Sequence, residues 1–493
     1  MARRPQISRW RLGLSSFAAG VIAASGQAPF DLWYLSLPAL AVLFMLILAQ
    51  VKTPRFAAFS AWIGGAGYFC ASLSWLISPF LIEADTYAWM APFALLLMGF
   101  GLALFWALAA WAAMYMPRPA IGLAVLLAGA ELARGYVLTG FPWALIGHIW
   151  IDTPVAQLAA YVGPSGLTLL TTAVAMGLAA GKIWGRGAAA LGLAAFWAGG
   201  VWTLNQPMPA DTAITLRLVQ PNAEQSLKWD AAQAQVFYDR LIRATSAAPK
   251  PNIVIWPETA LPYLQEQNDG ITADMARAAN GAALIYGRQR IEGDRAYNSL
   301  SVLNSAGKDA ALYDKHHLVP FGEYIPFGDF MYKWFGLTAF AAQLGNGYTA
   351  GAGPAVIDLG MAGGKFLPLI CYEAVFPQDL RAGSRPDWLL QVTNDAWFGT
   401  LTGPFQHAAQ SRLRAIEQGL PMVRVANTGV TALYDARGRL RADLPFGTEA
   451  HLDTVLPSAL PVPTYARFGE GPLLMLLAGG FALAFLRPKR VRY

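Results

Sequence analysis

Long runs of apolar residues, broken by short polar stretches, dominate the chain up to about residue 204. A helix needs about 20 mostly apolar residues to cross the hydrocarbon core of a bilayer. We therefore predict about eight membrane helices, seven before a large polar insert and one after it. Their predicted bounds are 12–29, 33–49, 56–80, 88–116, 120–138, 165–183, 188–204 and 471–486.

The pattern changes in the insert at residues 211–464, where charged and apolar residues mix. The strand-like stretches there are AITLRLVQ, NIVIWPE, ALIYGR, YNSLSVLN, KFLPLICYE, WLLQVTND, MVRVANTG and TALYDARG. Helical patterns fall between them, notably DAAQAQVFYDRLIRATS and FQHAAQSRLRAIEQG. Strands that alternate with helices predict layered sheets with helices outside, so we interpret the insert as an α/β domain.

Composition supports a membrane protein, because only 13% of the 493 residues are charged and the mean hydropathy is +0.38. Soluble domains carry about 25% charged residues. The net charge of +6 is concentrated at the two chain ends and in short loops. This distribution is typical of membrane topology and not of a nucleic-acid-binding surface.

Lysine and arginine residues set the orientation of the predicted helices, because cytoplasmic loops are rich in them. They precede the first predicted helix, follow the second, fourth and sixth, and end the chain: Arg3, Arg4, Arg9, Arg11, Lys52, Arg55, Arg118, Lys182, Arg186, Arg487, Lys489, Arg490 and Arg492. Eight crossings with both termini in the cytoplasm satisfy every loop, which places the insert in the periplasm of a bacterium. The first apolar run lacks a convincing small-residue cleavage site, so we interpret it as a retained anchor.

Two cysteines, Cys70 and Cys371, are present, which in practice excludes a disulfide framework. Cys70 lies in a predicted membrane helix whose Gly64, Gly65 and Gly67 are typical of close helix packing. Cys371 follows an apolar strand in LICYEAVFP. Free cysteines are mostly small buried residues, so a nucleophilic role for Cys371 depends on suitable partners.

Three motifs place reactive side chains at strand ends, where the reacting groups of layered α/β folds gather. Glu258 follows a strand in IVIWPETALP, Lys315 follows one in LYDKHHLVPFGEYIP, and Cys371 follows one in LPLICYEAVFP. Taken alone, a glutamate at such a position is usually solvated or caps a helix. Taken together, the three supply a base for the thiol proton, a cation for the oxyanion and a nucleophile.

The order and local sequences of these residues, WPET, YDKHHLVPFGEY and ICYE, resemble the Glu-Lys-Cys triad of the nitrilase superfamily. With apolar helices on both sides, the chain resembles the apolipoprotein N-acyltransferases, inner-membrane enzymes of bacterial lipoprotein maturation. The resemblance implies about eight transmembrane helices and a nitrilase-like α/β domain, an αββα sandwich. It implies transmembrane helices 1–7 in residues 1–210, a periplasmic catalytic domain in 211–464, and the eighth helix with a basic tail in 465–493.

The same resemblance implies roles for further residues. Glu323 in PFGEY resembles a supporting glutamate, and Tyr372 and Glu373 resemble a pair needed beside the nucleophile. Trp229 in QSLKWD resembles a tryptophan near the substrate entrance, although it could instead pack at the start of a helix. Arg134, at a predicted membrane boundary, could contact a lipid headgroup or act as an interfacial anchor.

The family's activity implies that a phospholipid donates an acyl chain to Cys371 and that the N-terminal amine of a diacylglyceryl-modified apolipoprotein accepts it. No cofactor or metal is implied.

Moving a sixteen-carbon chain fully into water would cost about 13 kcal/mol, at about 0.8 kcal/mol per CH₂. The site therefore belongs at the bilayer, and we interpret the apolar stretch at 328–345 as a lid or membrane-dipping arm; the alternative is a helix packed on the domain.

Two other functions remain open from the residues. The first is a membrane-tethered carbon–nitrogen hydrolase that uses the same triad with water as the acceptor. The second is a transporter or scaffold with an inactive insert, which the scarcity of paired charges within the helices disfavours.

His316 and His317 raise the possibility of a metal site, but neighbouring strand residues point to opposite faces and rarely bind one ion together. No acidic residue at metalloprotease spacing accompanies them. NDAWFG, residues 394–399, is predicted to be a structural loop near the active site.

Overall fold

The structure is a computed structural model that describes residues 8–179, 183–228, 230–261, 269–326 and 347–486. The chain divides into two compact units. The helical unit comprises residues 1–206, 401–409 and 463–493, and the α/β unit comprises residues 207–400 and 410–462.

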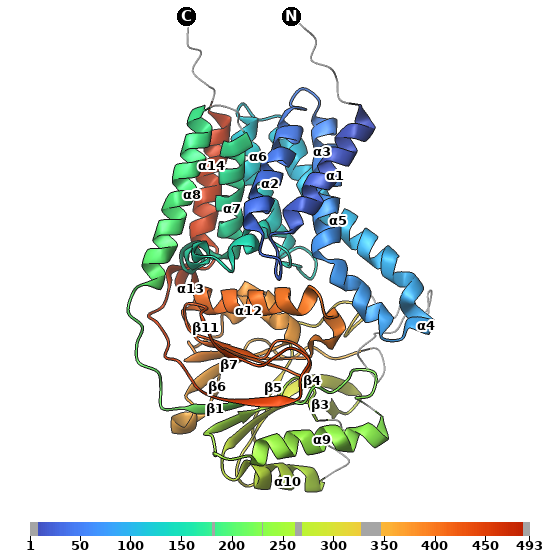
Figure 1. The fold of residues 1–493 in the computed structure, drawn as a ribbon, viewed down its shortest axis with the longest axis vertical. Helices are drawn as coiled ribbons and strands as arrows, with labels where there is room; N and C mark the ends of the chain where they lie inside the picture. The colour runs from blue at the N-terminus through green and yellow to red at the C-terminus, as the bar shows by residue number, and fades with distance from the viewer. Residues whose placement is uncertain (1–7, 180–182, 229, 262–268, 327–346, 487–493) are drawn as a thin grey trace, which may run out of the picture. The chain divides into compact units, whose positions relative to one another are not determined.

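Long helices form the helical unit and lie side by side (Figure 1). Within the described residues they are α1 (Arg9–Ala24), α2 (Trp33–Leu48), α3 (Pro54–Ser72), α5 (Ala91–Ala113), α6 (Pro119–Arg134), α7 (Ala159–Ala179), α8 (Ile183–Leu204) and α14 (Gly471–Phe485). Small residues let α1 and α3 approach closely, because a Cβ atom at Gly20 would overlap the Gly64 carbonyl group. Each of the eight apolar stretches predicted from the sequence thus overlaps a helix among the described residues.

The number of these helices that cross a membrane is a separate matter. By length and composition, three helical segments among the described residues can span a bilayer: residues 84–113, 154–179 and 183–204. A fourth is added if α3 and the short helix η1 (Ser74–Leu81), bent by 48° at their junction, form one span. Helices α2 and α14 are apolar but have only 16 and 15 residues, about 24 and 22 Å at 1.5 Å per residue. The predicted count of about eight crossings is therefore not confirmed.

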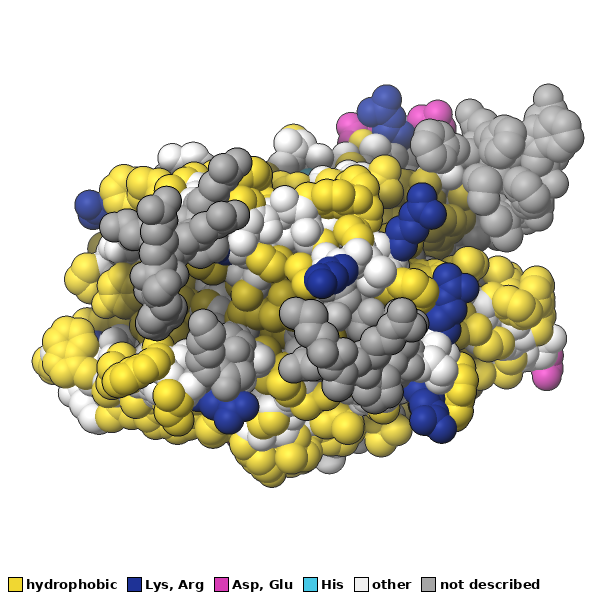
Figure 2. Space-filling view, turned by 90° about the horizontal axis from the view of Figure 1, so that it is seen from above, with side chains coloured by type: hydrophobic (Ala, Val, Ile, Leu, Met, Phe, Trp, Pro, Cys, Tyr) yellow, Lys and Arg dark blue, Asp and Glu magenta, His cyan; other side chains and the backbone are white. Residues whose placement is uncertain are grey.

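Large apolar side chains are exposed along several of these helices, as expected for a membrane protein. Leu97 on α5, Trp184 on α8 and Met475 on α14 are examples. The face drawn in Figure 2 is largely hydrophobic, and its lysine and arginine side chains are scattered over it as separate groups.

Among the described residues, two six-stranded sheets build the α/β unit. The first has the order β12 (Ala450–Val455), β1 (Thr215–Gln220), β2 (Ile253–Ile255), β3 (Ala283–Glu292), β4 (Arg295–Leu303) and β5 (Asp309–Asp314). The second has the order β11 (Leu440–Asp443), β10 (Ala432–Tyr434), β9 (Met422–Ala426), β8 (Trp388–Thr393), β7 (Lys365–Ile370) and β6 (Ile357–Asp358). Strands β1, β2 and β3 are parallel, as are β7, β8 and β9, and the remaining pairs are antiparallel.

Helices cover the outer face of each sheet (Figure 1). On the first sheet, α9 (Ala231–Ser246) and α10 (Asp269–Ala279) contribute Leu241 and Met275 to a core with Leu284. On the second sheet, Ala415 of α12 (Gly403–Gln418) packs with Leu389. The predicted nitrilase-like sandwich of two sheets between helix layers is confirmed for this unit.

Candidate active site

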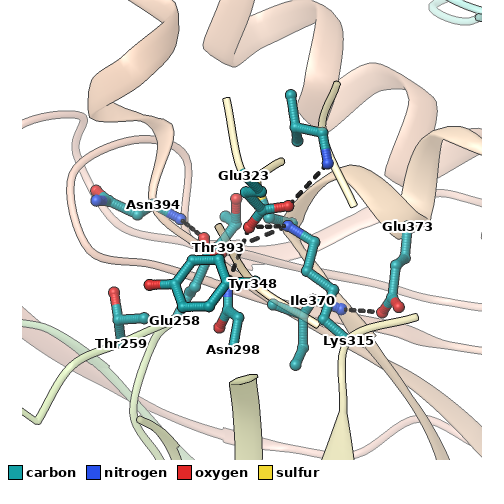
Figure 3. Close-up of polar contacts among 12 residues, drawn as sticks. Glu258, Thr259, Asn298, Lys315, Glu323, Tyr348, Ile370, Glu373, Thr393 and Asn394 are labelled. Atoms are coloured by element: carbon teal, nitrogen blue, oxygen red, sulfur yellow. Dashed lines mark hydrogen bonds and ion pairs between the residues drawn. The ribbon is translucent and has the colours of Figure 1, made fainter. Parts of the chain in front are cut away.

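Glu258 lies just beyond the end of β2, in a turn that begins at Pro257. Its carboxylate is buried and accepts two hydrogen bonds, one on each oxygen (Figure 3). The Asn298 side-chain nitrogen donates to Oε1 at 2.7 Å, and the Asn394 backbone N–H donates to Oε2 at 2.8 Å. These two donors fix the plane of the carboxylate.

Lys315 follows the last residue of β5, and its ammonium group is buried between two carboxylates. Nζ donates to Glu323 Oε1 at 2.8 Å and lies 3.8 Å from Glu258 Oε1. The other oxygen of Glu323 accepts the Val319 backbone N–H at 2.9 Å, and Asn298 donates to Oε1 at 3.1 Å. Glu323 thus binds Lys315 and closes the loop that carries both residues.

Cys371 begins a short 3₁₀ turn directly after β7, with φ at 53°. This left-handed conformation is unfavourable for a residue with a Cβ atom and is typical of functional turns. The Gln391 side chain donates to the Cys371 carbonyl oxygen at 3.0 Å. The thiol interacts electrostatically with both Glu258 and Lys315, so the structure brings the three predicted triad residues together.

Glu373 connects the cysteine turn to the loop that follows Lys315. Its fully buried carboxylate accepts the Ile370 N–H at 2.7 Å, the His316 N–H at 2.8 Å and the Tyr313 hydroxyl at 2.9 Å. Because it binds the residue just before Cys371 and the residue just after Lys315, Glu373 is placed to position both rather than to transfer a proton.

The neighbouring aromatic side chains pack around this connection. The Tyr372 ring is buried against the rings of His317, at 5.7 Å between centroids, and Phe376, at 4.8 Å. His317 Nδ1 lies 2.7 Å from Asp379 Oδ2, and His316 Nδ1 lies 2.7 Å from Glu373 Oε1. Both histidines therefore pair with carboxylates, and within the described residues no three His, Cys, Asp or Glu side chains are grouped to hold a metal ion.

Comparison with known proteins gives the family. An "Apolipoprotein N-acyltransferase N-terminal domain" model matches residues 19–177, and a "Carbon-nitrogen hydrolase" model matches residues 215–460. Proteins named apolipoprotein N-acyltransferase from Brucella suis and Rhodopseudomonas palustris are each 36% identical to this chain. The alignments cover 98% of both chains for the first and 99% for the second. The chain belongs to the apolipoprotein N-acyltransferase family.

A third relative of that name, from Sinorhizobium medicae, is 38% identical over 92% of each chain. Among solved structures, a CN-hydrolase superfamily protein from Xanthomonas campestris is 20% identical, with a TM-score of 0.36, and covers 58% of this chain and 100% of its own.

Electrostatics in this family member favour a neutral thiol and a charged lysine. Burial raises the pKa of Cys371, and the nearby Glu258 carboxylate raises it further, although Lys315 opposes this. Burial alone would lower the pKa of Lys315, but Glu323 and Glu258 outweigh burial and raise it. Burial also raises the pKa of Glu258, which makes its carboxylate a stronger base than a solvated one. A neutral thiol at rest therefore lies near a carboxylate able to accept its proton.

The sequence analysis missed Asn298 and Lys228 and gave Asn394 only a place in a nearby structural loop. Asn298 lies within β4 and binds both Glu258 and Glu323. The backbone of Asn394 binds Glu258, so the NDAWFG loop predicted to lie near the site contributes directly to it. Lys228 is buried next to the Glu258 turn. The sequence pattern could not reveal Asn298 and Lys228, because an asparagine in a strand and a lysine before a helix are common.

Not every predicted site residue joins this cluster. Trp229 and residues 328–345 lie outside the described residues. Arg134 belongs to the helical unit and is 2% exposed. It pairs with Glu131 at 2.8 Å and donates to the Trp143 carbonyl oxygen at 2.8 Å. The headgroup contact or interfacial anchoring expected of Arg134 stays a prediction; the structure shows its guanidinium buried in an ion pair.

We expect protonated His316 to stabilise the folded protein near neutral pH and to lose this effect in alkali. Burial would lower its pKa, but Asp379 and Glu373 outweigh burial and raise the pKa to about 9. Because this value exceeds the ordinary 6.5, the stabilisation is complete below about pH 6.5 and is lost as the pH rises through about 9. Thermal unfolding of the wild type and His316→Gln between pH 6 and 10 checks this.

The difference between these two unfolding temperatures should shrink as the pH rises. His451→Gln, which changes an exposed histidine, is the control and should show no such trend. A difference that stays constant across the range would mean that the charge of His316 does not stabilise the fold.

Proposed function

We propose that this chain transfers an acyl chain from a membrane phospholipid, through a thioester on Cys371, to the N-terminal amine of a diacylglyceryl-modified apolipoprotein. The observation that carries the proposal is the meeting of Glu258, Lys315 and Cys371, from three separate strand ends, in one buried site. The names of the full-length relatives support the same reaction.

In the first half-reaction, Cys371 Sγ attacks the ester carbonyl carbon while Glu258 takes the thiol proton. The Lys315 ammonium and the backbone N–H of Tyr372 stabilise the oxyanion that forms. The bond to the glycerol oxygen then breaks, and Glu258 returns the proton to that oxygen. Lysophospholipid leaves, and the acyl chain stays on Cys371 as a thioester.

In the second half-reaction, the amine of the acceptor attacks the thioester carbonyl carbon. Glu258 takes a proton from the amine, and Lys315 again stabilises the oxyanion. The carbon–sulfur bond breaks, and the proton passes from Glu258 to the sulfur. The products are an N-acylated acceptor and the free thiol of Cys371.

The proposal includes a location in the bacterial inner membrane, with the α/β unit in the periplasm and both termini in the cytoplasm. The exposed apolar helices and the alternation of basic loops support this topology. A cytoplasm-dependent reporter fused near Asp294 should stay inactive, and an active fusion would overturn the orientation.

A carbon–nitrogen hydrolase is the second candidate, favoured by the carbon–nitrogen hydrolase model that matches residues 215–460. Such an enzyme would use the same triad and pass the acyl group to water. Fatty acid and lysophospholipid would then form in equal amounts when no amine acceptor is present.

The decisive experiment incubates the protein with phospholipid alone and measures the intact mass. We expect the mass to increase by one acyl group on Cys371, with one equivalent of lysophospholipid released in a burst. The adduct should persist until a diacylglyceryl-cysteine peptide is added, and it should then appear as the N-acyl peptide. Continuous release of fatty acid without the peptide would favour the hydrolase, and acyl transfer without any adduct would rule out the thioester.

A further inference from the structure

Lys228 is a buried cation beside the Glu258 turn that the reaction steps above do not use. It lies in the loop before α9 and is 2% exposed. Its Nζ donates to the Thr259 hydroxyl at 2.6 Å and lies 3.5 Å from the Glu258 carbonyl oxygen. An ammonium group is costly to bury, so its position next to this turn suggests a role there.

The turn that Lys228 contacts has an unfavourable backbone. Thr259 has φ at 43°, a left-handed conformation that a β-branched residue rarely adopts. Gly287 of β3 supports the other side of the turn, and its N–H donates to the Pro257 carbonyl oxygen at 3.2 Å. A Cβ atom at Gly287 would lie 2.5 Å from the Thr259 nitrogen. The turn is therefore held between the backbone of β3 and the side chain of Lys228.

We propose that Lys228 is a positioning residue for Glu258, which holds the turn through the Thr259 hydroxyl and favours the ionised carboxylate through its positive charge. This rests on the proposed function only in that Glu258 is taken as the base for Cys371. The role is distinct from that of Lys315, which contacts the carboxylate oxygen itself at 3.8 Å.

The charged groups around Glu258 decide how removal of Lys228 acts. Burial and Glu323 raise the pKa of Glu258, while Lys315, the Asn298 hydrogen bond and Lys228 lower it. Removing the positive charge of Lys228 therefore raises the pKa of Glu258, so that a higher pH is needed to ionise the base. Burial lowers the pKa of Lys228 itself to about 8, partly opposed by Glu258, so this charge is present at neutral pH and is lost in mild alkali.

The test measures the pH dependence of the rate at which Cys371 reacts in the full-length protein. Two reagents are used in parallel: phospholipid, which gives the thioester, and iodoacetamide, which alkylates the thiol with release of iodide. Peptide mass spectrometry separates Cys371 from Cys70. Because alkylation needs no acyl donor, it tests Lys228 even if the proposed acyl transfer is wrong.

We expect Lys228→Met and Lys228→Gln to move the acidic limb of both profiles to higher pH. A shift of half a unit would lower the rate about threefold at any pH on the acidic limb, and the difference from wild type should shrink above about pH 8. Thr259→Val should slow both reactions without moving the limb, because it removes the hydroxyl and keeps the cation. Lys250→Met, at an exposed lysine of the same unit, should behave as wild type.

The two lysine variants protect the test against a folding defect, since glutamine keeps a hydrogen-bond donor and methionine keeps the length of the side chain. An acidic limb at the wild-type pH in a folded lysine variant would overturn the proposal. A shifted alkylation profile in a protein that forms no thioester would support the positioning role of Lys228. It would count only against the proposed acyl transfer.

Discussion

Replacing Cys371 with alanine is expected to abolish acyl transfer and the enzyme-bound acyl group together. The thiol is the only group in the proposed mechanism that forms a covalent bond to the acyl carbon, so its removal leaves no route to the thioester. Intact-mass measurement after incubation with phospholipid should show no adduct, and no burst of lysophospholipid should appear. Cys70→Ala is the matched control and should retain both, because the Cys70 thiol lies in the helical unit, in α3.

Cys371→Ser should also reduce acyl transfer, but less completely than Cys371→Ala. The hydroxyl group keeps nearly the size of the thiol in the turn at φ 53°, but it is much harder to ionise. We expect slow formation of an oxygen ester and a large loss of turnover. Normal turnover in the alanine variant would show that acyl transfer proceeds directly between donor and acceptor without Cys371.

Replacing Glu258 with glutamine is expected to reduce the rate of thioester formation by roughly 10²- to 10⁴-fold, the usual contribution of a general base. The amide cannot take the thiol proton. It also disturbs the local hydrogen bonds, because each carboxylate oxygen accepts from a donor, Asn298 on one side and Asn394 on the other. Whichever way the amide is turned, its NH₂ group faces one of these donors. Single-turnover acylation of Cys371 measures the effect.

The control for this variant is Glu292→Gln, at an exposed glutamate of the same unit, which should acylate at the wild-type rate. Thermal unfolding of both variants separates a loss of chemistry from a loss of fold. A Glu258→Gln protein that forms the thioester at an undiminished rate would exclude Glu258 as the base.

The sequence alone located much of this site. Glu258, Lys315 and Cys371 could be found because each follows a strand with a clear apolar pattern, and their joint order resembles one superfamily. The long helices could be found because runs of apolar residues are a strong local signal. Strands such as β6, with two residues, and β12, at a sheet edge, were missed because short or alternately exposed strands have weak patterns.

The tertiary structure decided which further groups touch the triad. Asn298, Asn394 and Lys228 come from a strand, a loop and a segment before a helix that are far apart in the sequence, and only the packing of the α/β unit brings them to Glu258. It also decided that Arg134 is buried in an ion pair with Glu131. Hydrophobic periodicity reports which residues are buried within one element, whereas hydrogen bonds and charge pairs between distant segments depend on how the elements pack together. Local sequence was therefore enough to predict the three candidate reacting residues, whereas the groups that surround them were set by long-range packing.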